Sequence, residues 1–221
     1  MRKIVLLSFD DGTVQDRKLV EVLNRRGAPG TFNLNSGLGD FVWQFEGHDV
    51  VRPPLESVRE LYTGHEVAGH GLTHAWLPGL TDEQLRWEVG EDQRRIGEVF
   101  GHARRGFSVP FSDCGAREVA VLKDVVPYIR LSAESESFAL PPDPWHIPIH
   151  GLIGEVNVEA KIRRFAHSEL PVSLFVLCGH AYELEFLDRW PLLEKLLEQL
   201  QAVEDAEFMT TMAFVQEFCG V

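Results

Sequence analysis

Two adjacent carboxylates, Asp10 and Asp11, follow an apolar run at residues 2–7. Such a continuous run is typical of a buried parallel strand. In α/β folds, ligands bind where strands end, because the loops leaving the strands converge there. Gly12 permits the backbone turn that would stop the two side chains from diverging. Asp-Gly is also a common turn dipeptide, so the pair indicates chemistry only if it has partners.

His70 and His74 supply such partners, because i, i+4 spacing places two imidazoles on one face of a turn. They follow a short predicted strand at residues 66–69. Two imidazoles and one carboxylate form a facial ligand set that leaves positions open for water and substrate. These ligands favour zinc, with cobalt, nickel or manganese as alternatives. The second carboxylate is then free to act as a base.

His180 follows the second clearly buried strand, residues 171–178, at the same predicted edge. Its position suits a catalytic acid, and a core or capping histidine is the alternative. Asp143 lies in a proline-rich loop, residues 140–148. Its carboxylate either bonds the far nitrogen of His180, which would give it a catalytic role, or forms a turn.

Candidate substrate-wall residues are Trp145, His150 and Tyr182, although His150 is equally compatible with loop structure. The glycine-rich connection at residues 35–54 is long and carries aromatic side chains, which either stack on a sugar or acyl group or pack the loop onto the body. The remaining histidines are expected to be solvated, packed or part of loop structure: His48, His65, His102, His146 and His167.

The composition is that of an ordinary soluble globule, with 44% hydrophobic and 25% charged residues among 221. A net charge of −13 argues against nucleic acid and anionic membranes as partners. No apolar run approaches the length of a membrane span. The three cysteines are far apart and lack metal-ligand spacing, which indicates reduced thiols. The early aspartates argue against a signal peptide, so we expect a cytoplasmic protein.

Helical and strand patterns alternate along the chain, which indicates a parallel sheet with crossover helices. The seven or eight predicted βα units favour a closed or nearly closed barrel over an open sheet, in one domain spanning residues 1–221. The predicted strands are 2–7, 30–34, 66–69, 106–109, 128–131, 171–178 and 207–209, with a further strand possible at the end of 140–148. The predicted helices are 15–26, 54–62, 81–100, 116–125, 156–167, 188–203 and 211–219.

Taken together, these residues resemble the polysaccharide deacetylase family, the NodB-homology group of carbohydrate esterase family 4. Residues 8–12 (SFDDG) are similar to the family's first motif, and residues 70–74 to its second. Residues 107–112 (FSVPFS) resemble the third motif, and Asp143 with Trp145 the fourth. Residues 178–183 resemble the last motif. The resemblance covers nearly the whole chain.

The resemblance implies a distorted (β/α)7 barrel, similar to a TIM barrel, and roles for individual residues. It makes Asp10 the catalytic base and His180 the general acid. The metal ligands it implies are Asp11, His70 and His74. The backbone N–H of Phe111 would help to hold the oxyanion. The implied reaction is metal-assisted hydrolysis of an acetyl amide or ester.

Two positions depart from the family pattern. The family usually has Ser or Thr directly after the first metal histidine, whereas this chain has Gly71 there and Thr73 two places later. The third motif usually carries an arginine braced against the base, and here that position is Ser108. Arg104 and Arg105 lie nearby but are offset. We therefore expect Asp10 to be held differently.

The expected partner is a small or oligomeric N-acetylated carbohydrate, acted on by a monomer or small homo-oligomer. Two alternatives remain open. One is a cyclic-amide or C–N hydrolase of the same superfamily that acts on a small metabolite. The other is a catalytically weak, carbohydrate-binding relative, which the missing arginine and the altered second motif would favour.

Overall fold

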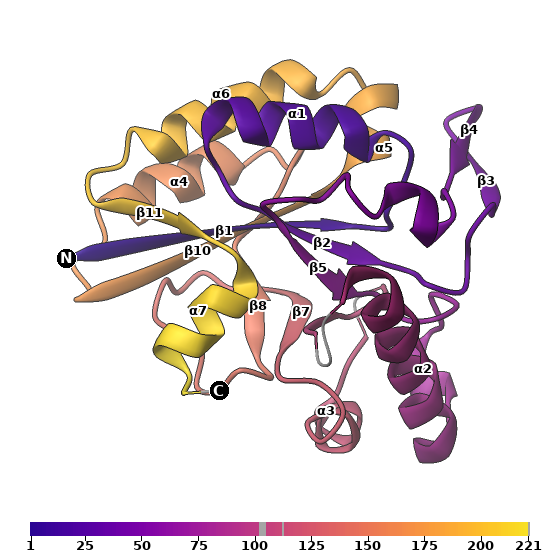
Figure 1. The fold of residues 1–221 in the computed structure, drawn as a ribbon. Coiled ribbons are helices and arrows are strands. Elements are labelled where there is room, and N and C mark those ends of the chain that lie inside the picture. Colours follow the sequence, from indigo (N-terminus) through magenta and orange to yellow (C-terminus); the bar gives the residue numbers. More distant parts are fainter. Residues whose placement is uncertain (102–104, 112, 221) are drawn as a thin grey trace.

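A parallel sheet of nine strands forms the centre of the molecule (Figure 1). The structure is a computed structural model that describes residues 1–101, 105–111 and 113–220. The strand order is β8-β7-β6-β5-β2-β1-β10-β9, with β11 beside β1. Within the described ranges the strands are β1 (Arg2–Asp10), β2 (Thr31–Leu34), β5 (Glu66–Gly69), β6 (Phe107–Ser108), β7 (Ile129–Glu134), β8 (Ile147–Ile149), β9 (Gly151–Leu152), β10 (Val172–His180) and β11 (Ala206–Met209).

The sheet curls into a nearly closed barrel, because its two end strands, β8 and β9, are consecutive in the chain and meet at His150. The His150 amide donates to the carbonyl of Val176 on β10 (2.9 Å), and the Val176 amide donates to His150 Nδ1 (3.0 Å). These bonds join the end of the sheet to β10. The prediction of a distorted (β/α) barrel is confirmed.

Alternation along β1 divides its side chains between two apolar clusters. Ile4 and Leu6 belong to an inner cluster, which also contains Phe214 of the last helix, α7 (Thr211–Phe218). Val5 and Leu7 belong to an outer cluster beneath α1 (Asp16–Arg26), α4 (Val158–Ala166) and α6 (Trp190–Gln201). Asp10 shares the inner face with Ile4 and Leu6, so the strand period places this carboxylate at the mouth of the barrel.

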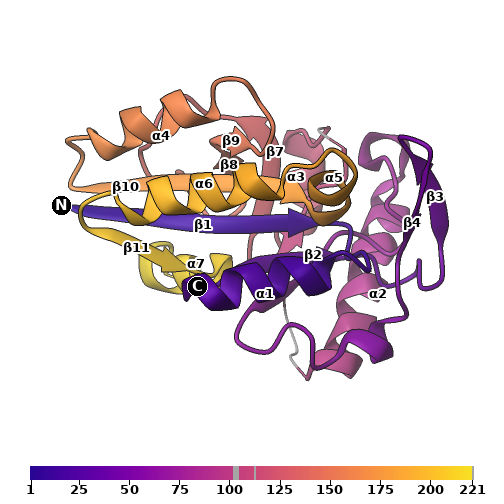
Figure 2. The ribbon, with the colours of Figure 1, turned by 90° about the horizontal axis from the view of Figure 1, so that it is seen from above.

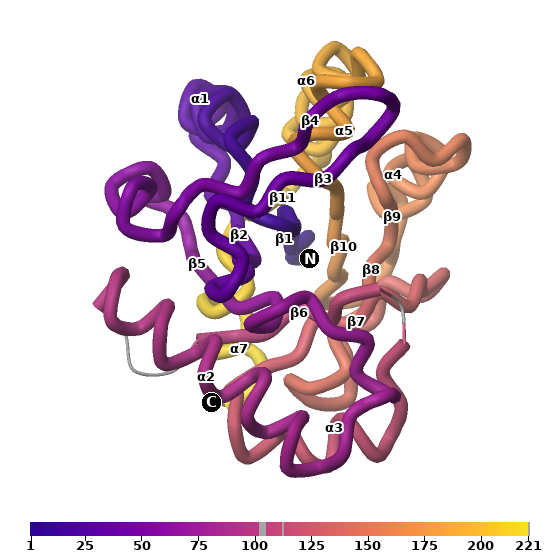
Figure 3. The backbone as a smooth tube through the Cα atoms, turned by 90° about the vertical axis from the view of Figure 1, so that its right-hand side faces the viewer, coloured from indigo at the N-terminus to yellow at the C-terminus, as the bar shows by residue number. Residues whose placement is uncertain are grey.

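The helices other than α7 surround the strands when the molecule is viewed toward the sheet end (Figure 3), and α7 packs against the inner cluster. The helices are α1 (Asp16–Arg26), α2 (Asp82–Phe100), α3 (Ala116–Leu122), α4 (Val158–Ala166), α5 (Ala181–Phe186), α6 (Trp190–Gln201) and α7 (Thr211–Phe218). A capping box starts α2, because Thr81 Oγ1 accepts from the Gln84 amide and Gln84 Oε1 accepts from the Thr81 amide. No helix among these described residues is long and apolar enough to cross a membrane.

The long connection at residues 35–54 contains an antiparallel hairpin that the sequence did not predict, β3 (Val42–Phe45) and β4 (His48–Val51). The hairpin lies beyond the carboxyl ends of β1 and β2 (Figures 1 and 2). Glu46 and Gly47 both have positive φ, which suits a tight hairpin turn.

Other elements differ in length from the prediction. The predicted helix at residues 54–62 is a 3₁₀ turn, Leu55–Val58, and the strand at 106–109 is limited to Phe107–Ser108. Helix α5 was not predicted, because six residues are too few to show a helical period. Three residues named in the sequence analysis, His102, Arg104 and Ser112, lie outside the described ranges.

Candidate metal centre and active site

Asp10 is the last residue of β1, and the sheet register sets it between Asn33 on β2 and His180 on β10. Parallel strands in register bring side chains from distant parts of the sequence to one edge. The Asn33 amide nitrogen Nδ2 donates to Asp10 Oδ1 (2.7 Å). The predicted base and the predicted acid therefore come from neighbouring strands of the same edge.

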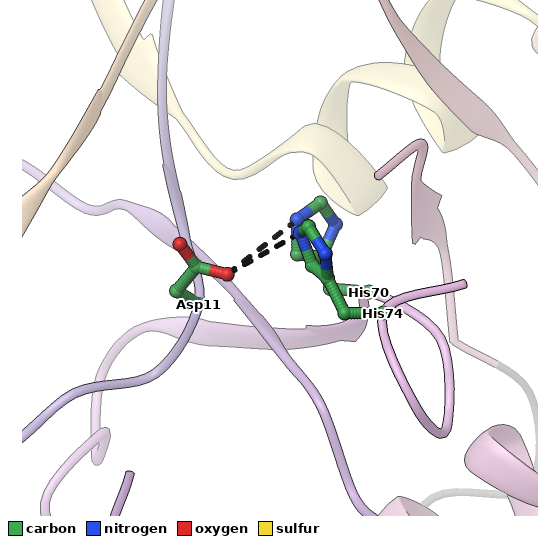
Figure 4. A group of neighbouring side chains, drawn as sticks. All are labelled: Asp11, His70 and His74. Atoms are coloured by element: carbon green, nitrogen blue, oxygen red, sulfur yellow. Dashed lines mark ion pairs between the residues drawn. The ribbon is translucent and has the colours of Figure 1, made fainter. Parts of the chain in front are cut away.

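The structure brings together Asp11, His70 and His74, the side chains predicted as metal ligands (Figure 4). One potential ligand atom from each lies within 4.8 Å of the others. Asp11 Oδ1 is 3.5 Å from His74 Nε2 and 3.9 Å from His70 Nε2. Asp11 and His74 both have positive φ, so their backbone turns aim the side chains at one point.

The protonation of the two histidines fits metal binding. His70 Nδ1 donates to the carbonyl of Ser108 (2.9 Å), which leaves the lone pair of Nε2 facing Asp11. Burial lowers the pKa of His70, and burial together with the nearby His70 lowers the pKa of His74 to about 4. Both rings are therefore neutral near pH 7, as imidazole ligands must be. A carboxylate and two neutral imidazoles suit a first-row divalent ion.

Carboxylates on α2 hold the loop that carries these histidines. The Gly71 amide donates to Asp92 Oδ2 (3.1 Å), and the Thr73 amide donates to Glu88 Oε1 (2.6 Å). Gly71 has φ +87°, and a Cβ there would lie 3.3 Å from Glu88 Oε1. The glycine that departs from the family pattern therefore suits a left-handed turn close to α2.

Arg130 on β7 holds Asp10 in the way expected of the arginine that is absent from residue 108. Its Nη2 donates to Asp10 Oδ1 (2.5 Å), to Asp10 Oδ2 and to Ser108 Oγ, and Ser108 Oγ donates to Asp10 Oδ1 (3.2 Å). Ser108 and Arg130 are directly paired across β6 and β7. Burial raises the pKa of Asp10, but the charges of Arg130 and nearby histidines hold it below its ordinary value. The sequence signal for Arg130 was a single cation inside an apolar strand.

His180 ends β10 and is oriented by Glu183, which the sequence analysis did not assign to this contact. His180 Nδ1 lies 3.1 Å from Glu183 Oε1, and its Nε2 lies 3.9 Å from Asp11 Oδ2. Burial lowers the pKa of His180, but pairing with Glu183 and the charges of Asp11 and Asp10 raise it to about 9. The i, i+3 spacing at the start of α5 could have indicated this pair.

The expected contact between Asp143 and His180 is wrong, because Asp143 Oδ1 instead accepts from the Trp145 amide (2.9 Å) and pairs with His146 Nδ1 (2.7 Å). Asp143 is thus the turn residue of the two alternatives. Trp145 packs against the cluster beside α3 and donates from Nε1 to the Val126 carbonyl (3.2 Å). Trp145 is not among the residues that line the cavity beside the aspartates and histidines.

His150 is also a structural residue rather than a wall residue. Its side chain is fully buried, and Nε2 contacts the Ser137 carbonyl (2.9 Å) while Nδ1 accepts the β10 amide described above. Burial lowers its pKa to about 4. A neutral ring is needed at this position, because Nδ1 must accept a hydrogen bond.

A cavity of about 420 Å³ opens beside the histidine and aspartate cluster. Of the predicted substrate-binding residues, Phe111 and Tyr182 line it. Phe111 is half exposed, and the centre of its ring lies 4.6 Å from the centre of the His74 ring. The centre of the Tyr182 ring lies 5.4 Å from the centre of the Trp43 ring and 5.1 Å from that of the Phe45 ring, both on the hairpin. The cavity therefore has an aromatic side chain on each of two walls.

A family model described as polysaccharide deacetylase matches residues 1–125, more than half of the chain. The chain belongs to the polysaccharide deacetylase family. No curated protein matches it in sequence.

Solved structures share the fold over nearly the whole chain. One is a family 4 acetyl xylan esterase from Clostridium thermocellum in complex with a cobalt ion, with 14% identity, TM-score 0.64, and coverage of 97% of this chain and 91% of that one. Another is a family 4 carbohydrate esterase from Bacillus anthracis, with 19% identity, TM-score 0.63, and coverage of 97% and 83%. The Xyl-CE4 domain of a xylanase from the hindgut metagenome of Trinervitermes trinervoides has 16% identity, TM-score 0.63, and coverage of 98% and 91%. The fold is therefore that of family 4 deacetylase barrels.

Proposed function

We propose that the protein is a metal-dependent hydrolase that removes an acetyl or other acyl group from an N-acetylated sugar, oligosaccharide or related amide. We assign the activity to one catalytic domain formed by residues 1–221. The observation that carries the proposal is the meeting of five groups around one cavity: Asp10, Asp11, His70, His74 and His180. Membership of the deacetylase family supports the reaction class.

The ligand set proposed for the ion is Asp11, His70 and His74, with zinc as the first choice and cobalt, nickel or manganese as alternatives. When bound, such an ion supplies Lewis acidity toward water and an acyl carbonyl. The neutral imidazoles and the ionised carboxylate support this choice of ligands. The solved cobalt complex named above has the same fold and supports a divalent ion in this barrel.

In the proposed reaction, Asp10 takes a proton from the attacking water. The Phe111 N–H donates to the carbonyl oxygen as negative charge develops there, which is worth about 3 kcal/mol for one such donor in other acyl-transfer enzymes. His180 then gives a proton to the departing amine nitrogen as the C–N bond breaks. Water and amide are thereby converted into a carboxylic acid and an amine. Asp10 then releases the proton it took and His180 regains one from solvent, which restores both groups, and the acid product ionises in solution.

The proposed substrate is a soluble amide or oligosaccharide, and the proposed compartment is the cytoplasm. The three cysteines are free thiols, which supports a reducing compartment. Phe111 and Tyr182 are proposed to contact the substrate. The argument for a catalytically weak relative loses force, because Arg130 braces Asp10 in place of the arginine that position 108 lacks.

The test is release of acetate or amine from a panel of N-acetylated sugars and small amides, before and after chelation and with zinc, cobalt, nickel or manganese restored. We expect activity that chelation abolishes and a divalent ion restores. Activity that persists unchanged after verified metal removal would overturn metal dependence, and activity only on cyclic amides would favour a C–N hydrolase.

Substitutions test the individual roles. Asp10→Asn should retain the ion but lower turnover by about 10²–10⁴-fold, the usual effect of losing a general base. His74→Ala should lose both the ion and turnover. Asp143→Asn is the matched control, because its carboxylate contacts the turn at His146 and should leave turnover unchanged. Parental turnover in Asp10→Asn would show that the base assignment is wrong.

A further inference from the structure

Asp11, one of the proposed metal ligands, has a strained backbone conformation. Its φ is +81°, in the left-handed region that residues with a Cβ seldom adopt. Arg52 contacts both parts of the residue: Nε donates to the Asp11 carbonyl (3.0 Å), and Nη2 donates to Asp11 Oδ1 (2.5 Å). One guanidinium therefore holds the strained backbone and the carboxylate at the same time.

The β3–β4 hairpin fixes the position of Arg52, which follows β4 directly. The Arg52 amide donates to the Phe41 carbonyl (3.0 Å), and the guanidinium carbon lies 4.3 Å from the centre of the Trp43 ring. The neighbouring Val51 carbonyl accepts from the Val14 amide (3.0 Å), just after the turn at Asp11. Arg52 is 6% exposed. The hairpin and the aspartate turn are thus joined by both backbone and side-chain bonds.

The oxygen that Arg52 contacts is also the one that faces the imidazoles of His70 and His74. Two opposite effects on metal affinity follow. A permanent positive charge beside Asp11 makes its carboxylate a weaker donor. A fixed ligand orientation makes the site stronger, as partners of metal ligands generally do.

We propose that Arg52 is a positioning residue for Asp11, and that through Arg52 the β3–β4 hairpin is a structural part of the metal centre. This inference rests on the proposed metal-dependent function. The two-point contact favours orientation as the larger effect, because a charge alone would need only the contact with the carboxylate. Lysine at this position would keep the charge but could not bond from Nε and Nη2 together.

The experiment compares zinc affinity in the full-length chain, by competition with a chromophoric chelator, for the parent, Arg52→Gln, Arg52→Lys and Arg105→Gln. We expect both Arg52 variants to bind zinc about 10–100-fold more weakly. Arg105→Gln is the matched control, because Arg105 is 7% exposed and also donates to backbone carbonyls, those of Val67 and Phe100. It should lose stability yet bind zinc as the parent does.

The absorption bands of the cobalt-loaded protein give a second readout, because they report ligand geometry directly. We expect both Arg52 variants to change these bands and Arg105→Gln to leave them unchanged. If Arg52→Gln does not fold, Arg52→Lys carries the comparison alone. Zinc binding as tight as the parent's or tighter in the Arg52 variants, with unchanged cobalt bands, would overturn the positioning role. A parent that binds no divalent ion would overturn the proposed function as well.

Discussion

At the scale of single residues, Asp10 is held by donors from three strands: Asn33 on β2, Ser108 on β6 and Arg130 on β7. The Asp10–Arg130 ion pair is buried, with side chains 10% and 3% exposed. Removing one partner of a buried pair leaves the other charge without compensation, which costs more than the pair itself contributes. The two residues should therefore depend on each other for stability.

Arg130→Gln should lower the free energy of unfolding by about 3–5 kcal/mol, because it leaves the Asp10 carboxylate buried and unpaired. The double variant Asp10→Asn/Arg130→Gln should recover part of this loss. Urea unfolding of the two single variants and the double variant measures the coupling.

The control for this cycle is Arg94→Gln, which removes an exposed arginine paired with Glu91 and Glu98 and should cost less than about 1 kcal/mol. If Arg130→Gln costs no more than this control, the Asp10–Arg130 pair is not the compensated buried pair described here.

The sequence could predict that Asp11, His70 and His74 would meet, because each follows a strand that ends at the same edge. It could not predict that Arg130 would reach Asp10, because that contact depends on the register of β6 with β7. The sequence also could not predict the contacts of Asp143, because they depend on the path of a loop that has no periodic pattern.

At the scale of elements, α2 supports the loop of the proposed ligands His70 and His74, because Asp92 and Glu88 accept hydrogen bonds from its backbone. Sequence analysis predicted a helix at residues 81–100, and the structure confirms it as α2. The hairpin and α5 escaped prediction, because short elements carry little periodic signal. The hairpin leads directly into Arg52 and α5 carries Glu183, so the missed elements bring two of the missed contacts. The third, between Arg130 and Asp10, comes from a strand that was predicted.

Gly71→Ala should lower the free energy of unfolding by about 1–2 kcal/mol, the cost of a left-handed conformation for a residue with a Cβ. It should also weaken zinc binding, because a Cβ would press on the carboxylate of Glu88 that holds the loop. Thermal unfolding and chelator competition measure the two effects.

The matched variant is Gly27→Ala at the end of α1, where φ is +61° and a Cβ would meet no atom within 4 Å. It should show a similar loss of stability and unchanged zinc affinity. Equal zinc affinity in both variants would show that the contact of the Gly71 loop with Glu88 of α2 does not affect the metal site.

At the scale of the whole molecule, buried carboxyl groups outside the ligand set link stability to pH. Burial raises the pKa of Asp16 and of Asp92 to about 7 each. In the unfolded chain such groups titrate near 3.8. Between these values the folded protein keeps protons on these two groups that the unfolded chain releases, so their contribution to the free energy of unfolding falls as pH rises and levels off above the folded pKa.

In the metal-free protein, each of these two carboxyl groups should therefore subtract up to about 1.4 kcal/mol per pH unit from the free energy of unfolding between about pH 4 and pH 7. His74 and His150, whose pKa values are lowered to about 4, act in the opposite direction between about pH 4 and 6.5, so the prediction concerns the difference between the parent and a variant without Asp16. Asp16→Asn removes one of the two carboxyl groups, so the free energy of unfolding of this variant should rise relative to that of the parent as pH increases from about 4 to 7. The Asn side-chain oxygen can still accept from the Tyr62 hydroxyl, so the packing around it is kept. Urea unfolding at a series of pH values measures the free energy of unfolding of the parent and of Asp16→Asn. Equal slopes in the two would contradict the raised pKa of Asp16.

The pairing of β1 with β10 has a consequence for biosynthesis. These strands match over their whole lengths, from Arg2 with Val172 to Asp10 with His180. The ribosome therefore releases Asp11, His70 and His74, the proposed metal ligands, more than a hundred residues before His180, the proposed acid. Until then one edge of the first strand has no neighbour. The nascent chain therefore carries an apolar central strand with an unpaired edge until β10 is made, and the carboxylates at the end of β1 cannot be held in their final positions before then.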